Sequence, residues 1–453
     1  MRRHAIVTRL GNRDRARVLV ASDTDVQTKV PFFCDNRPAS KRLVHKPMLQ
    51  QFQRLGLQPP EIAMDLIVLA ATVFAADLRI SRSMDSQDGW TREIDLYVPV
   101  SDVPRWNTQR QVLSQALTFL TGDVWRLYFR ARPRGMETLS RPLDKNSETL
   151  KATDTACLFS GGLDSFIGAI DFLESGKQPI LVGHHKSPDV AKAQGECVSF
   201  LRSSYPDRPP EFADMYLEVP KGLFRDAEEK TERGRSFLFF ALGAGVASAL
   251  GRESHLIVPE NGLISLNVPL THLRLGALST KTTHPYFMES YQRLLTNLGL
   301  GVRLANPYQC KTKGEMVRDC KSGAILRAGV TRTMSCAHPT ARRWLGEPPK
   351  HCGTCVPCLI RRAALRFAYD RDPTRYAVSI RSRSLDPTTS EGEQVRALQL
   401  AMARLRAHPG AERLLIHESG RLPIDGVALD QLASVYRRGM EEVAALLKHV
   451  STT

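Results

Sequence analysis

An apolar run that stops at a glycine turn and continues at once into a helical pattern constrains this chain most. Residues 156–165 read Ala-Cys-Leu-Phe-Ser-Gly-Gly-Leu-Asp-Ser. Residues 156–159 predict a short buried strand, and the apolar spacing of residues 166–173 predicts a helix. Glycines let a backbone approach an anion, and a helix start adds N–H donors and partial positive charge. The stretch therefore predicts a strand, turn and helix that cup a phosphate.

Polar side chains flank these glycines. The hydroxyls of Ser160 and Ser165 can add donors to a phosphate. Asp164 is unfavourable beside an anion unless a cation is present, and a magnesium ion that bridges nucleotide phosphates would account for it. The alternative interpretation is a tight turn that only connects a strand to a helix.

The order Ser-Gly-Gly-Leu-Asp-Ser resembles the PP-loop of the ATP pyrophosphatases, and it lacks the Gly-Lys-Ser/Thr ending of a Walker A loop. That family splits ATP between the α and β phosphates, adenylates its substrate and releases pyrophosphate. The resemblance implies ATP and Mg²⁺ as cofactors. It also implies nucleotide contacts from Ser160, Gly161, Gly162, Leu163, Asp164 and Ser165.

Length and charge bound the remaining possibilities. A chain of 453 residues suits two or three domains, and its net charge of +16 favours polyanionic partners. Because the arginines are dispersed along the chain, nucleic-acid binding stays open. The longest apolar runs, residues 66–76 and 237–250, are shorter than the ~20 residues that span a bilayer. With no signal peptide after Arg2 and Arg3, we expect a cytoplasmic protein without a membrane partner.

The hydrophobic pattern divides the chain into three parts. Residues 1–150 predict an accessory α+β domain, in which two strands, 5–10 and 16–21, form a hairpin around a Gly-Asn-Arg-Asp turn. Residues 132–151 predict a linker. Residues 371–453 predict a helical extension that either forms its own lobe or packs on the N-terminal domain.

Residues 151–370 alternate predicted strands with helices, which indicates a doubly wound parallel α/β sheet. The strands are expected at 156–160, 180–184, 213–219, 255–259 and 302–305. Ligands bind beyond the carboxyl ends of such strands. His184 and His185 lie at one of these ends, where they either approach the nucleotide or simply pack.

Basic residues gather at the same predicted rim. Arg235 precedes an apolar helix, where its charge opposes the helix dipole and a bound anion would compensate it. Lys281 and Lys313 open two further helices, and the strand ends at 260–262 and 306–308 face the same side. Solvent-exposed cations are the alternative for each residue, and their shared location favours a functional rim.

Four of the nine cysteines gather near the end of the predicted core. Cys336 precedes a compact C-x-x-C-x-x-C run formed by Cys352, Cys355 and Cys358. Four thiolates in this spacing favour a closed structural Zn²⁺ site, and an Fe–S cluster is the alternative. A saturated site leaves no open position, so we assign this metal no catalytic role.

Taken in order, these motifs resemble those of the 7-cyano-7-deazaguanine synthases (QueC). The shared features are the PP-loop, an arginine that opens an apolar helix, a Thr-Lys-x-Glu helix start, and Ser-Cys before C-x-x-C-x-x-C. The resemblance implies an AMP-forming C–N ligase that adenylates a 7-deazaguanine carboxylate, after which ammonia gives an amide and then a nitrile. It implies catalytic roles for Asp164, Arg235, Lys281 and Lys313, and a nucleotide contact from His184.

The sequence also departs from that family. Ser236 replaces an asparagine, the gap between Cys336 and Cys352 is long, and both ends carry extra segments. These segments suggest a specialised QatC-like variant from antiphage defence that delivers the adenylated deazapurine to a protein acceptor or partner subunit. Stand-alone synthesis for queuosine-type pathways, tRNA modification and a non-enzymatic scaffold remain alternatives, and a homodimer is left open.

Overall fold

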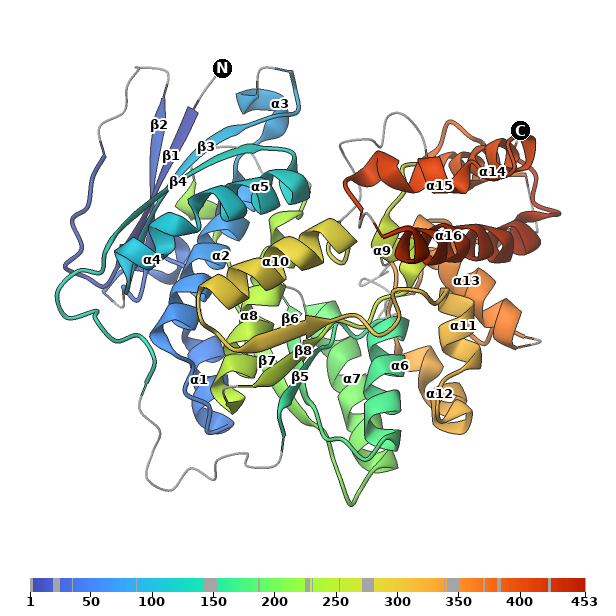
Figure 1. The fold of residues 1–453 in the computed structure, drawn as a ribbon, viewed down its shortest axis with the longest axis horizontal. Coiled ribbons are helices and arrows are strands. Elements are labelled where there is room, and N and C mark those ends of the chain that lie inside the picture. Colours follow the sequence, from blue (N-terminus) through green and yellow to red (C-terminus); the bar gives the residue numbers. More distant parts are fainter. Residues whose placement is uncertain are drawn as a thin grey trace.

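Two parallel sheets organise the chain (Figure 1). The computed structural model describes residues 3–452 except for residues 19–24, 35, 87, 142–152, 186–187, 225–228, 230, 252, 271–280, 338, 340–349, 370, 381–383 and 423–424. The first sheet has the order β2-β1-β3-β4, with bounds β1 (Arg3–Leu10), β2 (Val26–Phe32), β3 (Glu93–Val100) and β4 (Val124–Ala131). The second has the order β7-β6-β5-β8-β9, with bounds β5 (Thr155–Leu158), β6 (Ile180–His185), β7 (Glu211–Tyr216), β8 (Ser254–Ile257) and β9 (Val302–Ala305).

The second sheet confirms the predicted doubly wound fold. All of its strand pairs are parallel, and its predicted strands are confirmed with shifts of a few residues at their ends. The chain builds outward from β5 to β6 and β7, then crosses over to β8 and β9 on the other side of β5. This reversal makes a switch point between β5 and β8, where ligands of open α/β sheets bind.

The hairpin predicted around Gly11 is wrong. β1 pairs in parallel with β2, while residues 16–18 form no strand and residues 19–21 lie outside the described part. The Asp14 carboxylate accepts hydrogen bonds from the backbone N–H groups of Leu10 and Ala16. It thereby fixes a tight turn after β1, but the strand that follows pairs with β1 in the parallel direction and forms no hairpin with it.

Helices fill the space between the two sheets. The N-terminal part contains α1 (Lys46–Arg54), α2 (Glu61–Arg79), α3 (Arg82–Asp85), α4 (Val103–Thr108) and α5 (Arg110–Thr121). Helix α2 contacts β3 and packs along α8 (Gly234–Leu250), which in turn lies on β5, β6 and β8. Helix α5 likewise packs on α10 (Pro285–Asn297), which contacts β9 of the second sheet.

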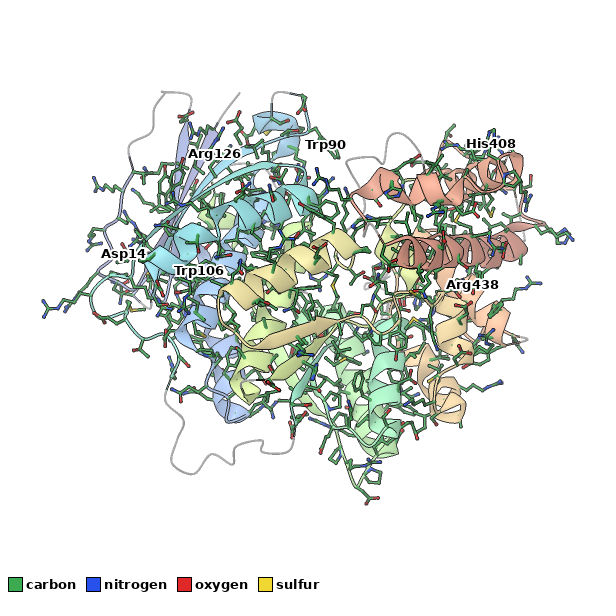
Figure 2. The ribbon with its side chains drawn as sticks, viewed as in Figure 1. Asp14, Trp90, Trp106, Arg126, His408 and Arg438 are labelled. Carbon is green, nitrogen blue, oxygen red and sulfur yellow. The ribbon has the colours of Figure 1, made fainter. Side chains whose placement is uncertain are left out.

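One apolar core therefore joins the N-terminal part to the second sheet. It runs from Phe32 and Phe74 to Leu158 and Phe240. On α4, the buried Trp106 donates its Nε1–H to Asp65 of α2 at 3.1 Å (Figure 2). The domain boundary near residue 150 stays a prediction, and the core is continuous across it.

The remaining helices cover the other face of the second sheet and form a C-terminal lobe (Figure 1). Helices α6 (Leu163–Glu174) and α7 (Pro188–Ser204) contact β5 and β6. The lobe has its own apolar core, which includes α9 and α13. Its arrangement favours a separate lobe over packing on the N-terminal domain. The other helices are α9 (Gly262–Leu266), α11 (Lys313–Arg318), α12 (Gly323–Gly329), α13 (Val356–Ala368), α14 (Ser390–Ala407), α15 (Glu412–Leu415) and α16 (Gly426–Leu447).

The C-terminal helix α16 is tied to the sheet region by buried polar contacts. Glu442 accepts hydrogen bonds from the Thr312 hydroxyl and from the Gly314 N–H at the start of α11. Arg438, also on α16 (Figure 2), forms an ion pair with Glu315 of α11 at 2.6 Å. Within the described residues, no helix is both long and apolar enough to cross a membrane.

Candidate functional site

The predicted PP-loop lies between β5 and α6 and forms a compact turn. Gly161 takes a left-handed φ of +77°, and Gly162 is the N-cap of α6. The Ser160 hydroxyl accepts from the Gly162 N–H at 3.2 Å and contacts the Ser165 hydroxyl at 3.2 Å. The structure therefore brings both predicted serines to the start of α6, where the first N–H groups have no partner within the helix.

Gly161 also needs to be glycine because of a close neighbour. A Cβ atom there would lie 3.2 Å from the backbone nitrogen of Gln194 on α7. The Gln194 side chain is buried and donates to the Phe159 carbonyl at 3.1 Å, so α7 cannot easily withdraw. Helix α7 thus restricts the backbone conformation of the loop at Gly161.

We expect Gly161→Ala to weaken ATP binding and lower stability by more than the cost of its backbone conformation, which is about 1–2 kcal/mol for a left-handed non-glycine residue. Gly176→Ala is the matched control, because Gly176 has a φ of +76° and its Cβ would meet only the end of the Arg208 side chain. Chemical denaturation and ATP titration of both variants measure the difference. Equal losses in the two variants would contradict the role of Gln194.

Asp164 is brought together with Lys313, as the shared rim predicted. The Lys313 ammonium lies 3.1 Å from Asp164 Oδ1, and both side chains are nearly buried. Asp164 Oδ2 accepts from the Asn261 side-chain amide at 2.6 Å and from its N–H at 3.2 Å. Both oxygens are thus engaged by protein groups, and a magnesium ion on Asp164 would have to displace an ammonium. The magnesium contact of Asp164 stays a prediction.

Glu260 lies at the end of β8 beside this pair. Burial, with a smaller contribution from the Asp164 charge, raises the pKa of Glu260 to about 7. Its carboxylate accepts a hydrogen bond from the Thr283 hydroxyl. A carboxyl group with such a pKa can hold or release a proton near neutral pH.

This raised pKa predicts a pH-dependent stability. The folded chain keeps on Glu260 a proton that the unfolded chain loses near pH 4.5, so the free energy of unfolding falls as the pH rises from about 4.5 to about 7. Glu442 behaves in the same way, because burial raises its pKa to about 7. We expect Glu260→Gln to flatten part of this slope in denaturation series between about pH 5 and about pH 8. The exposed Glu289→Gln is the control, and an unchanged slope in Glu260→Gln would refute the assignment.

Arg235 reaches the rim at the end of β6. Its guanidinium donates to the His184 carbonyl at 3.0 Å, and burial lowers its pKa. The His184 ring is buried and packs edge-on against Phe74 at 5.9 Å, which supports the packing interpretation. A nucleotide contact from His184 stays a prediction.

The anion expected at the start of α8 is a protein carboxylate. Asp77 of α2 accepts from the Gly234 N–H at 2.7 Å. The same carboxylate belongs to a buried ion network with Arg82, Arg92 and Asp123. The N-terminal part of the chain thereby supplies the negative charge that the basic helix start requires.

Lys281 points toward the N-terminal part. Its ammonium lies 4.5 Å from the centre of the Phe119 ring on α5. Burial lowers the pKa of Lys281, and the nearby Arg233 charge adds to this effect. Among the described residues, Lys281 forms no hydrogen bond or ion pair with Asp164 or Lys313, so its catalytic role stays a prediction.

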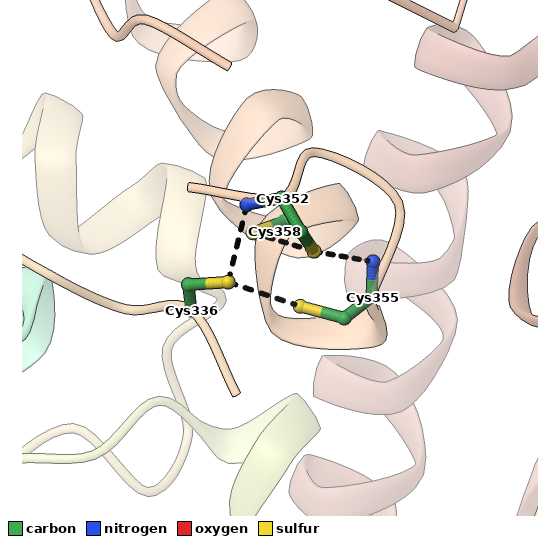
Figure 3. Close-up of side chains that lie close together, drawn as sticks. All are labelled: Cys336, Cys352, Cys355 and Cys358. Atoms are coloured by element: carbon green, nitrogen blue, oxygen red, sulfur yellow. Dashed lines mark hydrogen bonds between the residues drawn. The ribbon is translucent and has the colours of Figure 1, made fainter. Parts of the chain in front are cut away.

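The four predicted metal ligands form one cluster (Figure 3). The sulfur atoms of Cys336, Cys352, Cys355 and Cys358 lie within 4.8 Å of one another. The Cys336–Cys355 and Cys352–Cys358 pairs are each 3.9 Å apart. A tetrahedron with Zn–S bonds of ~2.3 Å has edges of roughly 3.8 Å, so the cluster could hold zinc.

The cysteine cluster is connected to the PP-loop through the residue before Cys336. The Ser335 hydroxyl accepts from the Leu163 N–H at 3.2 Å, and the neighbouring Met334 N–H donates to the Gly161 carbonyl at 2.8 Å. Arg361 of α13 is fully buried and donates to the Ser335 hydroxyl at 3.3 Å. A metal on the four thiolates would therefore hold part of the loop in place.

The sequence placed residues 260–262 on the rim and Ser335 beside Cys336, but it predicted none of the contacts made at this site by Asn261, Glu260, Ser335 and Arg361. A sequence signal exists for Asn261, because asparagine before Gly-Leu-Ile is a typical N-cap, and its side chain does accept from the Ile264 N–H. For Ser335 and Arg361 the signal is only their position beside the cysteine ligands.

Comparison with known proteins supports the motifs. No family model and no solved structure matches the chain. The 7-cyano-7-deazaguanine synthase of Brucella ovis is 27% identical over 165 residues, which are 35% of this chain and 61% of that protein. The 7-cyano-7-deazaguanine synthase of a Ruegeria species (strain TM1040) is 29% identical over 166 residues, 36% of this chain and 61% of the relative. The match thus spans less than two thirds of these relatives. Over about a third of its length, this chain is QueC-like, related to the 7-cyano-7-deazaguanine synthases.

Proposed function

We propose that this protein is an ATP-dependent, AMP-forming C–N ligase that adenylates a 7-deazaguanine carboxylate and transfers the acyl group to an amine. The observation that carries the proposal is the turn between β5 and α6, with Lys313 held beside it by Asp164. The names of the curated relatives supply the substrate class.

The reaction has two steps, adenylation of the carboxylate and transfer of the acyl group to an amine. The carboxylate oxygen attacks the α-phosphorus of ATP, and the bond to the leaving pyrophosphate breaks. An amine then attacks the acyl carbon, AMP leaves, and the amine loses a proton to give an amide. AMP is a far better leaving group than oxide, so the enzyme's task is positioning and charge stabilisation.

The residues of the site suit these steps. The hydroxyls of Ser160 and Ser165 and the N–H groups that follow Leu163 in the first turn of α6 hold the pyrophosphate. Lys313 and Arg235 offset the negative charge on the phosphates. Glu260, with its pKa of about 7, takes the proton of the attacking amine. Mg²⁺, when bound with ATP, would supply further charge neutralisation on the phosphates.

The N-terminal part and the C-terminal helix α16 suggest a macromolecular acceptor. The N-terminal part reaches the rim through Asp77 and Phe119, and α16 holds the start of α11 through Glu442. A ligase for two small molecules does not need such support. We propose that these parts grip a protein acceptor or partner subunit, in the manner of a QatC-like defence protein.

Incubation with Mg-ATP and 7-carboxy-7-deazaguanine tests the proposal. AMP and pyrophosphate should appear in equal amounts, and intact mass should show the deazapurine amide on a protein or peptide amine. If ammonium alone gives the free nitrile, the chain is a stand-alone synthase. If only tRNA gains mass, the tRNA-modifying alternative holds. Absence of AMP in every mixture would refute the ligase.

A further inference from the structure

A cleft lies apart from the PP-loop, in the C-terminal part of the chain. It has a volume of about 480 Å³ and opens between α13, the segment that follows it and the end of α16. Its lining combines three arginines with aromatic and apolar side chains, namely Arg362, Arg366, Arg371, Tyr376, Val378 and Leu446. A volume of this size suits a small organic ligand.

Arg362 is the buried arginine of the cleft. It is 8% exposed, and its guanidinium lies 3.7 Å from the centre of the Tyr376 ring. One guanidinium nitrogen donates to the Val378 carbonyl at 2.7 Å, while the buried Nε has no hydrogen-bond partner. Among the described residues, no carboxylate forms an ion pair with Arg362. The negative charges of Asp372 and Cys358 act on this guanidinium. Its buried and unpartnered Nε beside an open cleft nevertheless indicates an anionic ligand.

The other charged side chains of the cleft do not neutralise the positive charge of Arg362. Arg366 and Arg371 are exposed and form no ion pair within the described part of the chain. The one acidic side chain in the lining, Asp372, accepts from the Thr374 N–H at 2.8 Å and from the Tyr376 hydroxyl at 2.7 Å. The cleft therefore presents more positive than negative charge to a ligand.

We propose that this cleft is a second nucleotide site, which binds the phosphate of a mononucleotide or of a nucleotide within an RNA strand. Arginine forks match phosphate oxygens. The apolar and aromatic lining suits a base or sugar, which a site for a bare anion would not need. The inference stands independently of the reaction at the PP-loop.

The second site shares a wall with the PP-loop region. Thr374, in the lining of the cleft, accepts from Arg361 Nε at 3.3 Å. Arg361 in turn donates to Ser335, whose hydroxyl accepts from the PP-loop N–H of Leu163. A nucleotide in the cleft would thus lie on the far side of the arginine that supports the loop.

The test uses the full zinc-loaded chain with a saturating non-hydrolysable ATP analogue, so that the PP-loop is filled. AMP is titrated by calorimetry, and a fluorescently labelled single-stranded RNA and a glutamate-rich peptide by anisotropy. The double variant Arg366→Gln/Arg371→Gln is compared with Arg396→Gln/Arg406→Gln on α14, which removes the same charge from exposed positions outside the cleft.

We expect the cleft variant to bind AMP, RNA or both about tenfold more weakly than the unmodified chain, and the control variant to bind nearly as well as that chain. If the cleft variant loses affinity for AMP, the cleft is a mononucleotide site. If it loses affinity for RNA alone, the cleft binds a nucleotide within a strand. Equal losses in both variants, no nucleotide binding, or cleft-dependent binding of the peptide alone would overturn the proposal.

Discussion

Replacing Cys352 with serine is expected to release zinc, loosen the segment that supports the PP-loop and abolish AMP formation. Three thiolates would remain of a cluster whose sulfurs lie within 4.8 Å of one another. Structural zinc contributes about 10–16 kcal/mol to folding in small zinc domains, so losing one ligand removes a large stabilisation. Most of the fold should persist, because the two cores beside the sheets do not contain Cys352.

The loss of activity follows from the contacts between the cluster and the loop. Without the metal, Cys336 no longer fixes the position of Ser335, so the 3.2 Å hydrogen bond from the Leu163 N–H to Ser335 is weakened. Metal content by elemental analysis, thermal unfolding and AMP release measure the three expected losses. Elemental analysis of the unmodified chain also separates zinc from the Fe–S alternative, which would bring iron and visible absorption.

Cys310→Ser is the matched control for this experiment. Cys310 is an exposed cysteine outside the cluster, and its thiol lies 3.6 Å from the Gln431 side-chain oxygen. We expect the control to keep its zinc, stability and activity. A Cys352→Ser protein that retains zinc and forms AMP at the unmodified rate would contradict both the ligand set and its coupling to the loop.

Structural features that depend on only a few consecutive residues were predictable from the sequence. The strand, glycine turn and helix at 155–174 and the C-x-x-C-x-x-C spacing each depend on local geometry, and the structure confirms both arrangements. The parallel sheet followed from strands that alternate with helices. Even the wrong hairpin had a correct local part, since Asp14 does make a turn after β1.

Apart from the pairing of Asp164 with Lys313 at the shared rim, individual contacts between distant residues were not predictable. Nothing near Gly234 shows that Asp77, 157 residues earlier, supplies the anion at the start of α8. The bond between Asn261 and Asp164 spans 97 residues, and that between Glu442 and Thr312 spans 130. Such pairs depend on which strands and helices become neighbours, and this information is spread over the whole chain.

The second large effect is expected for Lys313→Ala, which should lower kcat for AMP formation by about 10²–10³. The ammonium is 5% exposed and held 3.1 Å from Asp164 at the start of α11. From there it can move from the carboxylate to the phosphate charge that develops as pyrophosphate leaves. Removing it also leaves the Asp164 charge buried, and breaking a buried pair costs about 3–5 kcal/mol of stability.

Asp164→Asn separates the catalytic role of Lys313 from this structural cost. The amide keeps the shape of the side chain but breaks the ion pair, so stability falls while the ammonium remains free to reach the phosphate. We expect Asp164→Asn to lose stability with a much smaller loss of kcat, and Lys313→Ala to lose both. Lys311→Ala, whose ammonium pairs with Asp319 at 3.2 Å on the surface, should lose neither. Equal losses of kcat in Asp164→Asn and Lys313→Ala, at a temperature where both variants are folded, would contradict a role of the Lys313 ammonium that is separate from its pairing with Asp164.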